Sequence, residues 1–348
     1  MVYMKRRVSI VDVAKLSKTS TTTVSRVIND DGYPVAKETR DRVLKAVEEL
    51  DYLPSLSAQK LRKDFSKMIG LITRDIAADF FSEIAKGATE RAMDLGYLSL
   101  ICNTGREPSK ELKFHELLWR NRVRGIVLIG GGYDTEDYRE MMTRQLHRST
   151  QFGFRIVTNT PQGFDMPSVT YDFIGAFFTL ITHLVEHQHR HIALLTSEKY
   201  VYTSLEHQKG FMCAMDTYRL PTDDRYLKFR TFTEQGGYES CKELLALPDP
   251  PTALCCGCDP IAVGAMRAIK EAGLSVPNDI SIVSVGNTTI AKHLYPSLTC
   301  IDVPRYDIGA RSVEMILTEN YTRDEHIVLP TRLIKRESVK IRRGHGDH

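Results

Sequence analysis

Hydrophobic positions in residues 1–50 recur at the spacing expected for three short amphipathic helices. Ser9 precedes the first helix and Asp12 follows three positions later, which is the pattern of a capping box. Ser20 stands where it can cap the second helix, and the third helix follows a turn at residues 30–38. Three helices of this length bury one small core. Their apolar faces consist of Ile10, Val13 and Ala14, of Val24, Val27 and Ile28, and of Val43, Ala46, Val47 and Leu50.

Short apolar runs alternate with helical segments from residue 67 onward. Fully apolar strands that are separated by helices indicate parallel sheets covered on both faces. The expected fold class is therefore α/β, with a three-helix headpiece in front of the sheets. Ligands of such sheets bind at the carboxyl ends of the strands, so the residues that follow each run are candidate binding residues. The runs are residues 68–73, 98–103, 125–130, 155–159, 191–196, 252–256 and 280–285.

The composition is that of a soluble globular protein. The chain has 348 residues, of which 42% are hydrophobic and 26% are charged, so two or three domains are expected. It shows no apolar run long enough to span a membrane and no export signal. We therefore expect a cytoplasmic protein without a membrane partner, whose seven cysteines are reduced thiols.

Positive charge is concentrated in the N-terminal part. Residues 1–67 carry 14 Lys and Arg against 9 Asp and Glu, whereas the remaining residues carry 33 against 35. A basic head on a mildly acidic body favours a polyphosphate partner such as DNA or RNA.

The outer face of the second helix carries small or fork-shaped hydrogen-bonding side chains. Such side chains near a helix N-terminus read base edges in the major groove of DNA, and hydroxyls beside them hold phosphates. The alternative is an ordinary exposed helix, for which lysine and glutamate would be expected. The candidate base-reading residues are Thr21, Thr22, Ser25, Arg26 and Asn29, and the candidate phosphate-binding residues are Ser20 and Thr23.

Residues 8–30 and 39–62 resemble the helix-turn-helix headpiece and hinge of the LacI/GalR family of bacterial repressors, whose pattern runs D-V-A-x-x-A-G-V-S-x-x-T-V-S-R-V-x-N. The resemblance implies that Thr21, Thr22 and Arg26 stand at base-reading positions. Lys18 departs from the pattern, because the family usually has glycine there. If that position has a positive φ, lysine costs about 1 kcal/mol there, although its charge could instead contact a phosphate.

The expected hinge, residues 54–65, has a helix-forming composition but is too short to be a stable helix alone. It should fold only against a partner. The resemblance implies that two hinge helices, one from each subunit, pair in the minor groove, where Leu61 wedges into a base step and Ala58 allows close approach. The alternative is a plain linker whose leucines pack on the body.

The rest of the chain, to about Val339, resembles the family's two-lobed, periplasmic-binding-protein-like sensor. Residues 1–53 are therefore expected to form the headpiece, and residues 66–348 the effector-binding and dimerisation domain. The segments 69–88, 124–130 and 251–287 carry this resemblance. It implies a cleft between the lobes that takes a small molecule, commonly a sugar or a nucleobase. The chain is expected to cross between the lobes near residues 160–166, 293–297 and 324–330.

The candidate effector residues combine family features with departures. His207 stands where the family usually has an arginine, and Gly286 and Asn159 replace usual aspartates. Arg74, with the SVGNT segment, is similar to the trehalose repressors, whose effector is a phosphorylated disaccharide, and the planar fork of arginine suits phosphate. In the alternative, Arg74 pairs with Asp75 or Asp79 and touches no ligand. The candidates are Arg74, Phe80, Phe81, Asn159, His207, Phe232 and Asn287.

Other clusters in the sequence give only weak indications of a metal site or a nucleotide-binding site. Cys255, Cys256 and Cys258 lack a second pair at zinc-ligand spacing, and the histidines of residues 183–191 suit a helix end and turn. The glycine-rich stretch at residues 129–134 lacks the pattern of a nucleotide-binding loop. No metal or cofactor is therefore expected.

These features together predict a sequence-specific transcription regulator, a repressor controlled by a sugar or sugar phosphate. We expect a homodimer on palindromic double-stranded operator DNA, because one headpiece reads only a few base pairs. An α/β enzyme and a freestanding sugar-binding protein are the alternatives. The basic head argues against both, and no paired base and nucleophile is recognisable.

Overall fold

The computed structural model describes residues 8–29, 33–50, 52 and 65–342, and the chain divides into two compact units, Met1–Ser66 and Lys67–His348. Ala58, Leu61 and the side chain of Asn29 lie outside the described residues. No helix in the described part of the chain is both long and apolar enough to cross a membrane.

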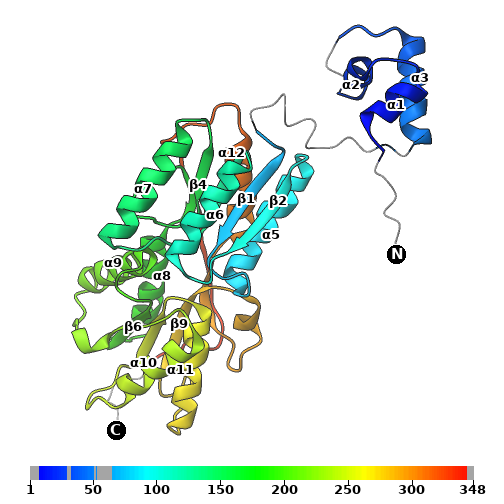
Figure 1. The fold of residues 1–348 in the computed structure, drawn as a ribbon. Coiled ribbons are helices and arrows are strands. Elements are labelled where there is room, and N and C mark those ends of the chain that lie inside the picture. The colour runs from blue at the N-terminus through cyan, green and yellow to red at the C-terminus, as the bar shows by residue number, and fades with distance from the viewer. Residues whose placement is uncertain (1–7, 30–32, 51, 53–64, 343–348) are drawn as a thin grey trace, which may run out of the picture. The chain divides into compact units, whose positions relative to one another are not determined.

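The first unit contains the three helices that the sequence predicts, α1 (Ile10–Leu16), α2 (Thr21–Asn29) and α3 (Lys37–Glu49) (Figure 1). The Asp12 carboxylate accepts hydrogen bonds from the backbone N–H of Ser9 at 2.8 Å and from its hydroxyl at 2.6 Å, which fixes the start of α1. Val13, Val24 and Val43, one from each helix, are fully buried in the small core.

The first lobe of the body contains a six-stranded, all-parallel sheet in the order β11-β5-β4-β3-β1-β2. Helices α5 (Asp79–Asp94), α6 (Pro108–Arg120), α7 (Glu136–Thr150) and α12 (Arg305–Leu317) pack against it. Its strands are β1 (Met68–Thr73), β2 (Leu98–Asn103), β3 (Gly125–Ile129), β4 (Arg155–Thr158), β5 (Ser168–Tyr171) and β11 (His326–Leu329).

The second lobe contains a six-stranded sheet in the order β12-β10-β9-β8-β6-β7, in which only β12 runs antiparallel to its neighbour. Helices α8 (Phe173–Glu186), α9 (Tyr202–Thr217), α10 (Glu234–Leu245) and α11 (Asp259–Glu271) belong to this lobe. Its strands are β6 (Ile192–Thr196), β7 (Leu227–Phe229), β8 (Ala253–Cys256), β9 (Ser281–Gly286), β10 (Thr299–Asp302) and β12 (Arg332–Ile334).

All seven apolar runs form strands, but two of the expected lobe crossings were wrong. Residues 160–166 join β4 to β5 within the first sheet, and residues 293–297 precede β10 within the second. The chain instead crosses after Tyr171, between β10 and α12, and between β11 and β12. The error arose because β5 and β10 are short strands with polar positions, and each adds one strand before the crossing.

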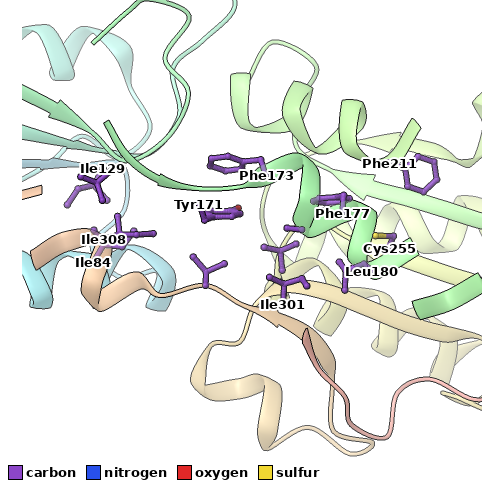
Figure 2. Close-up of a cluster of buried hydrophobic side chains, with 14 of the residues drawn as sticks. Ile84, Ile129, Tyr171, Phe173, Phe177, Leu180, Phe211, Cys255, Ile301 and Ile308 are labelled. Carbon is purple, nitrogen blue, oxygen red and sulfur yellow. The ribbon is translucent and has the colours of Figure 1, made fainter. Parts of the chain in front are cut away.

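The core continues from one lobe into the other along the first crossing. Figure 2 shows Tyr171 and Phe173 between Ile129 of the first lobe and Phe177 of the second. The rings of Tyr171 and Phe173 lie 4.0 Å apart between centroids. Their packing makes this crossing part of a buried core rather than a free linker.

Candidate DNA-reading helix and effector cavity

The outer face of α2 presents the side chains expected to read DNA. Thr21 and Thr22 are exposed, while Val24 and Val27 on the opposite face are buried. The Ser20 hydroxyl accepts a hydrogen bond from the N–H of Thr23 at 3.1 Å, as an N-cap residue does. The start of α2 is therefore fixed, with its threonines facing outward.

Arg26 and Ser25 are partly exposed on the same helix. The guanidinium carbon of Arg26 lies 3.7 Å from the centroid of the Tyr33 ring. This cation–π contact restricts the arginine, which lowers the entropy cost of ordering it against a base.

A cavity of about 940 Å³ lies between the two lobes of the body, at the carboxyl ends of their parallel strands. Its volume is within the range of small-molecule sites, which is roughly 300–1,000 Å³. Five of the seven expected effector residues line it, namely Arg74, Phe80, Phe81, His207 and Phe232.

Arg74, directly after β1, is the main cationic group of the first-lobe wall. Its side chain is buried, and among the described residues its Nε and Nη2 atoms have no hydrogen-bond partner. Asp75 lies 3.7 Å from Arg106, and Asp79 accepts a hydrogen bond from the N–H of Thr289 at 2.7 Å. Asp75 and Asp79, the acids that the sequence offered as partners of Arg74, therefore bond to other groups.

A buried acid lies near Arg74 and was not expected from the sequence. Glu111 of α6 is buried and accepts a hydrogen bond from the hydroxyl of Tyr138 at 3.0 Å. Burial raises the pKa of Glu111, and the charge of Arg74 and the Tyr138 hydrogen bond oppose this rise only in part. The hydrophobic pattern of α6 did not indicate that Glu111 is buried, because a glutamate on an amphipathic helix is normally exposed.

His207 of α9 presents a neutral imidazole in the second-lobe wall. Burial lowers the pKa of His207 to about 3, so the ring is uncharged at physiological pH. Its Nδ1 lies 3.0 Å from the Thr196 hydroxyl, and it stacks on Phe177 with ring centroids 4.5 Å apart. Within the described part of the chain its Nε2 is buried without a partner, so this nitrogen can bond to a ligand.

Asp259, at the start of α11, is an acid in the cavity wall that was not predicted. Its carboxylate accepts hydrogen bonds at 2.6 Å from both the N–H and the hydroxyl of Thr288, and another from the Ser284 hydroxyl. Burial raises the pKa of Asp259, while these hydrogen bonds lower it. The carboxylate thus connects α11 to the segment after β9.

Asn159 and Asn287 do not line the cavity, contrary to expectation. The side-chain amide of Asn159 donates to the Ser312 hydroxyl at 2.7 Å and to the Val169 carbonyl at 3.2 Å, so it faces α12 and β5. Asn287 has a φ of 54°, and its side chain bonds Asp302 and Arg336. Both amides connect elements of the fold.

The comparisons with known proteins agree with this architecture. Residues 9–55 match the model of bacterial regulatory proteins of the lacI family, and residues 181–339 match that of a periplasmic binding protein-like domain. The transcriptional repressor PurR of Mannheimia succiniciproducens is 31% identical over 335 residues, which cover 95% of this chain and 98% of that protein. The chain belongs to the LacI family.

Solved structures of family members have the same fold as this LacI-family chain. The Lac repressor dimer, bound to operator and the anti-inducer ONPF, matches with a TM-score of 0.83 at 24% identity, covering 96% of this chain and 100% of that one. A LacI-family regulator from Enterococcus faecium with bound ribose matches with a TM-score of 0.69 at 25% identity, covering 79% and 100%. The expected headpiece and two-lobed sensor are thereby confirmed.

Proposed function

We propose that this LacI-family regulator is a repressor that binds a palindromic operator as a homodimer and is controlled by a sugar or sugar phosphate in the inter-lobe cavity. The observation that carries the effector proposal is the pair of buried, unpartnered groups in the described cavity wall, Arg74 in one lobe and His207 in the other.

The α2 helix supports the DNA-binding part of the proposal. Thr21, Thr22, Ser25 and Arg26 offer the hydroxyls and the guanidinium that read base edges, with Asn29 as a further candidate from the sequence. Ser20 and Thr23 at the helix start are suited to a phosphate, because a helix N-terminus attracts anions. Residues 54–65, with Ala58 and Leu61, are proposed as the hinge that contacts the minor groove.

The edge of the first sheet supports dimer formation. Strand β2 is the last strand of that sheet, and Leu98 and Ile101 on it are 56% and 48% exposed. Met93 and Leu95, just before this strand, are also exposed. Large apolar side chains gathered at a sheet edge mark a protein interface, and a second copy of this chain is the proposed occupant. The Lac repressor, which shares the fold, is a dimer in its operator complex.

Two unpartnered groups of the described cavity wall, one from each lobe, define the effector that we propose. Arg74 offers a cationic fork for an anionic group such as a phosphate, and His207 offers a neutral nitrogen. Phe80, Phe81 and Phe232 provide apolar surface for the faces of sugar rings. A phosphosugar would place its phosphate toward Arg74 and its hydroxyls toward His207.

A thermal-shift experiment with matched pairs tests this proposal. The full chain would be heated with trehalose or trehalose 6-phosphate, and with glucose or glucose 6-phosphate. We expect a phosphorylated member to raise the unfolding temperature of the body, and Arg74→Ala to abolish that shift. Arg267→Ala, on the exposed face of α11, is the matched control and should retain it.

Each other outcome of this experiment has a definite meaning. Equal shifts by both members of a pair, unchanged in Arg74→Ala, would leave a neutral sugar as effector and refute the phosphate assignment. If the free sugars and phosphosugars all fail while a different class of compound binds, the carbohydrate assignment is wrong.

A further inference from the structure

The glycine-rich stretch at residues 129–134 joins the first lobe to the second. It follows β3, and Tyr133 forms an isolated antiparallel bridge with Val201, just before α9. The N–H of Asp134 donates to the Tyr200 carbonyl at 2.6 Å, and the N–H of Tyr202 donates to the Gly132 carbonyl at 3.1 Å. The Tyr202 hydroxyl also donates to the Asp134 carboxylate at 2.9 Å. Three hydrogen bonds therefore connect the lobes at one point beside the cavity.

The glycines of this stretch allow the two lobes to approach closely. A Cβ atom on Gly131 would lie 2.3 Å from the hydroxyl oxygen of Thr203, which belongs to the second lobe. A Cβ atom on Gly163, in another first-lobe loop, would lie 2.0 Å from the ring of Tyr202. Side chains at these positions would push the lobes apart, which gives the glycines an inter-lobe role in place of nucleotide binding.

Tyr133 connects this contact to Arg74. The guanidinium carbon of Arg74 lies 4.1 Å from the centroid of the Tyr133 ring. The same ring stacks on Tyr200 of the second lobe, with centroids 6.0 Å apart, and its hydroxyl donates to the Arg106 carbonyl at 2.7 Å. One aromatic ring therefore contacts both the buried cation and the opposite lobe.

We propose that residues 131–134 and 200–203 form an inter-lobe clasp, and that Tyr133 is a positioning residue that holds Arg74 toward the cavity. Closing the clasp covers the Arg74 end of the cavity, so a ligand at Arg74 enters or leaves when the clasp is open. An anion at Arg74 stabilises the closed form, because it gives Nε and Nη2, which have no partner among the described residues, an acceptor in the geometry that Tyr133 maintains. The role of Tyr133 rests on the proposed anionic effector, whereas the clasp itself does not.

Hydrogen–deuterium exchange of the full-length protein without ligand tests the clasp. The N–H groups of Asp134 and Tyr202 bond across the lobes, so their exchange rates report how often the clasp opens. Gly131→Ala should raise both rates on the order of tenfold, because the added methyl group overpacks the contact with Thr203. Gly131 has no positive φ, so alanine itself is tolerated in the first lobe.

A second substitution distinguishes opening of the clasp from structural damage to the first lobe. Thr203→Ala removes the hydroxyl that lies 2.3 Å from the added methyl, leaving contacts of 3.4 Å, so the double variant should regain nearly wild-type exchange. Unchanged exchange at Asp134 and Tyr202 in Gly131→Ala would overturn the clasp. The clasp would also be overturned if Gly131→Ala speeds exchange throughout β1 and β3 and the added Thr203→Ala does not return these rates to wild type.

Titration with inorganic phosphate tests the role of Tyr133. Phosphate should slow exchange at the clasp in the wild type and should not do so in Arg74→Ala. Tyr133→Leu should weaken phosphate binding about fivefold through loss of the cation–π contact, whereas Tyr133→Phe, which keeps the ring, should bind within about twofold of wild type. Equal affinity in Tyr133→Leu would refute the positioning role. Absence of phosphate binding to the wild type would refute both the anionic effector and this role, while the exchange of Gly131→Ala still decides the clasp.

Discussion

Replacement of Lys18 by glycine should stabilise the headpiece. Helix α1 ends at Leu16 with Ser17 as its C-cap, and the N–H of Thr19 then donates to the Ala14 carbonyl at 3.0 Å, while the N–H of Lys18 donates to the Lys15 carbonyl at 3.3 Å. This pair of bonds is the Schellman motif, in which the residue after the C-cap takes a left-handed conformation. Lys18 occupies that position with a φ of 52°.

The size of the effect follows from two opposing terms. A side chain in the left-handed region costs roughly 1–2 kcal/mol, and glycine removes this cost. Glycine also gives the unfolded chain more conformational freedom, which lowers the gain in folding stability by roughly 0.5–1 kcal/mol. Lys18→Gly should therefore raise the free energy of unfolding of the headpiece by about 1 kcal/mol, or slow the exchange of its buried amides roughly fivefold.

Amide exchange of α1, α2 and α3 in the full chain measures this directly, because the headpiece forms its own compact unit. The single tryptophan, Trp119, lies in the body, so its fluorescence during urea unfolding serves as an internal control and should not change. Lys18→Ala removes the charge but keeps a Cβ atom, and it should leave headpiece stability nearly unchanged. Equal stabilisation by alanine and glycine would refute the conformational explanation.

Seven strands were predicted from runs that are rich in apolar residues, and five of these strands are almost fully buried. Strands β1, β3, β6, β8 and β9 are buried on both faces, so apolar residues predominate in each of them, although Ser284 lies within β9. Strands β7 and β12 have three residues each, which is too short for a pattern to separate them from loops. Strands β5 and β10, with four residues each, were missed as well, and two lobe crossings were misplaced for that reason.

The cavity residues also divide into those that the sequence could predict and those that it could not. Arg74 could be found because it directly follows a predicted strand, and parallel strands gather such positions at one edge. The direction of an amide side chain depends on its tertiary neighbours, so the sequence could not show that Asn159, which faces Ser312, and Asn287, with its positive φ, lie outside the cavity lining. The burial of Glu111 results from packing that a helical pattern does not show.

Further predictions concern DNA binding and pH. Arg26→Ala should cost about 1–3 kcal/mol at one base pair of each half-site, so selection of operator sequences should show relaxed preference there, and an unchanged consensus would contradict the assignment of α2. Leu61→Ala, in the proposed hinge, should weaken operator binding and reduce DNA bending while effector binding to the free protein persists. Acid should destabilise the body, because burial lowers the pKa of His115 and His189 to about 4 and that of His207 to about 3. Between about pH 6.5 and pH 4 the unfolded chain therefore binds protons that the folded chain does not, and each histidine removes at most about 1.4 kcal/mol of stability per pH unit. The buried carboxyls of Glu111 and Asp259 have raised pKa values and oppose this loss, so the test compares wild type with His115→Gln, in which both carboxyls remain. Urea unfolding at pH 7.5 and 5.5 should show a smaller loss of stability in the variant, and an equal loss would mean that His115 is protonated in the folded protein.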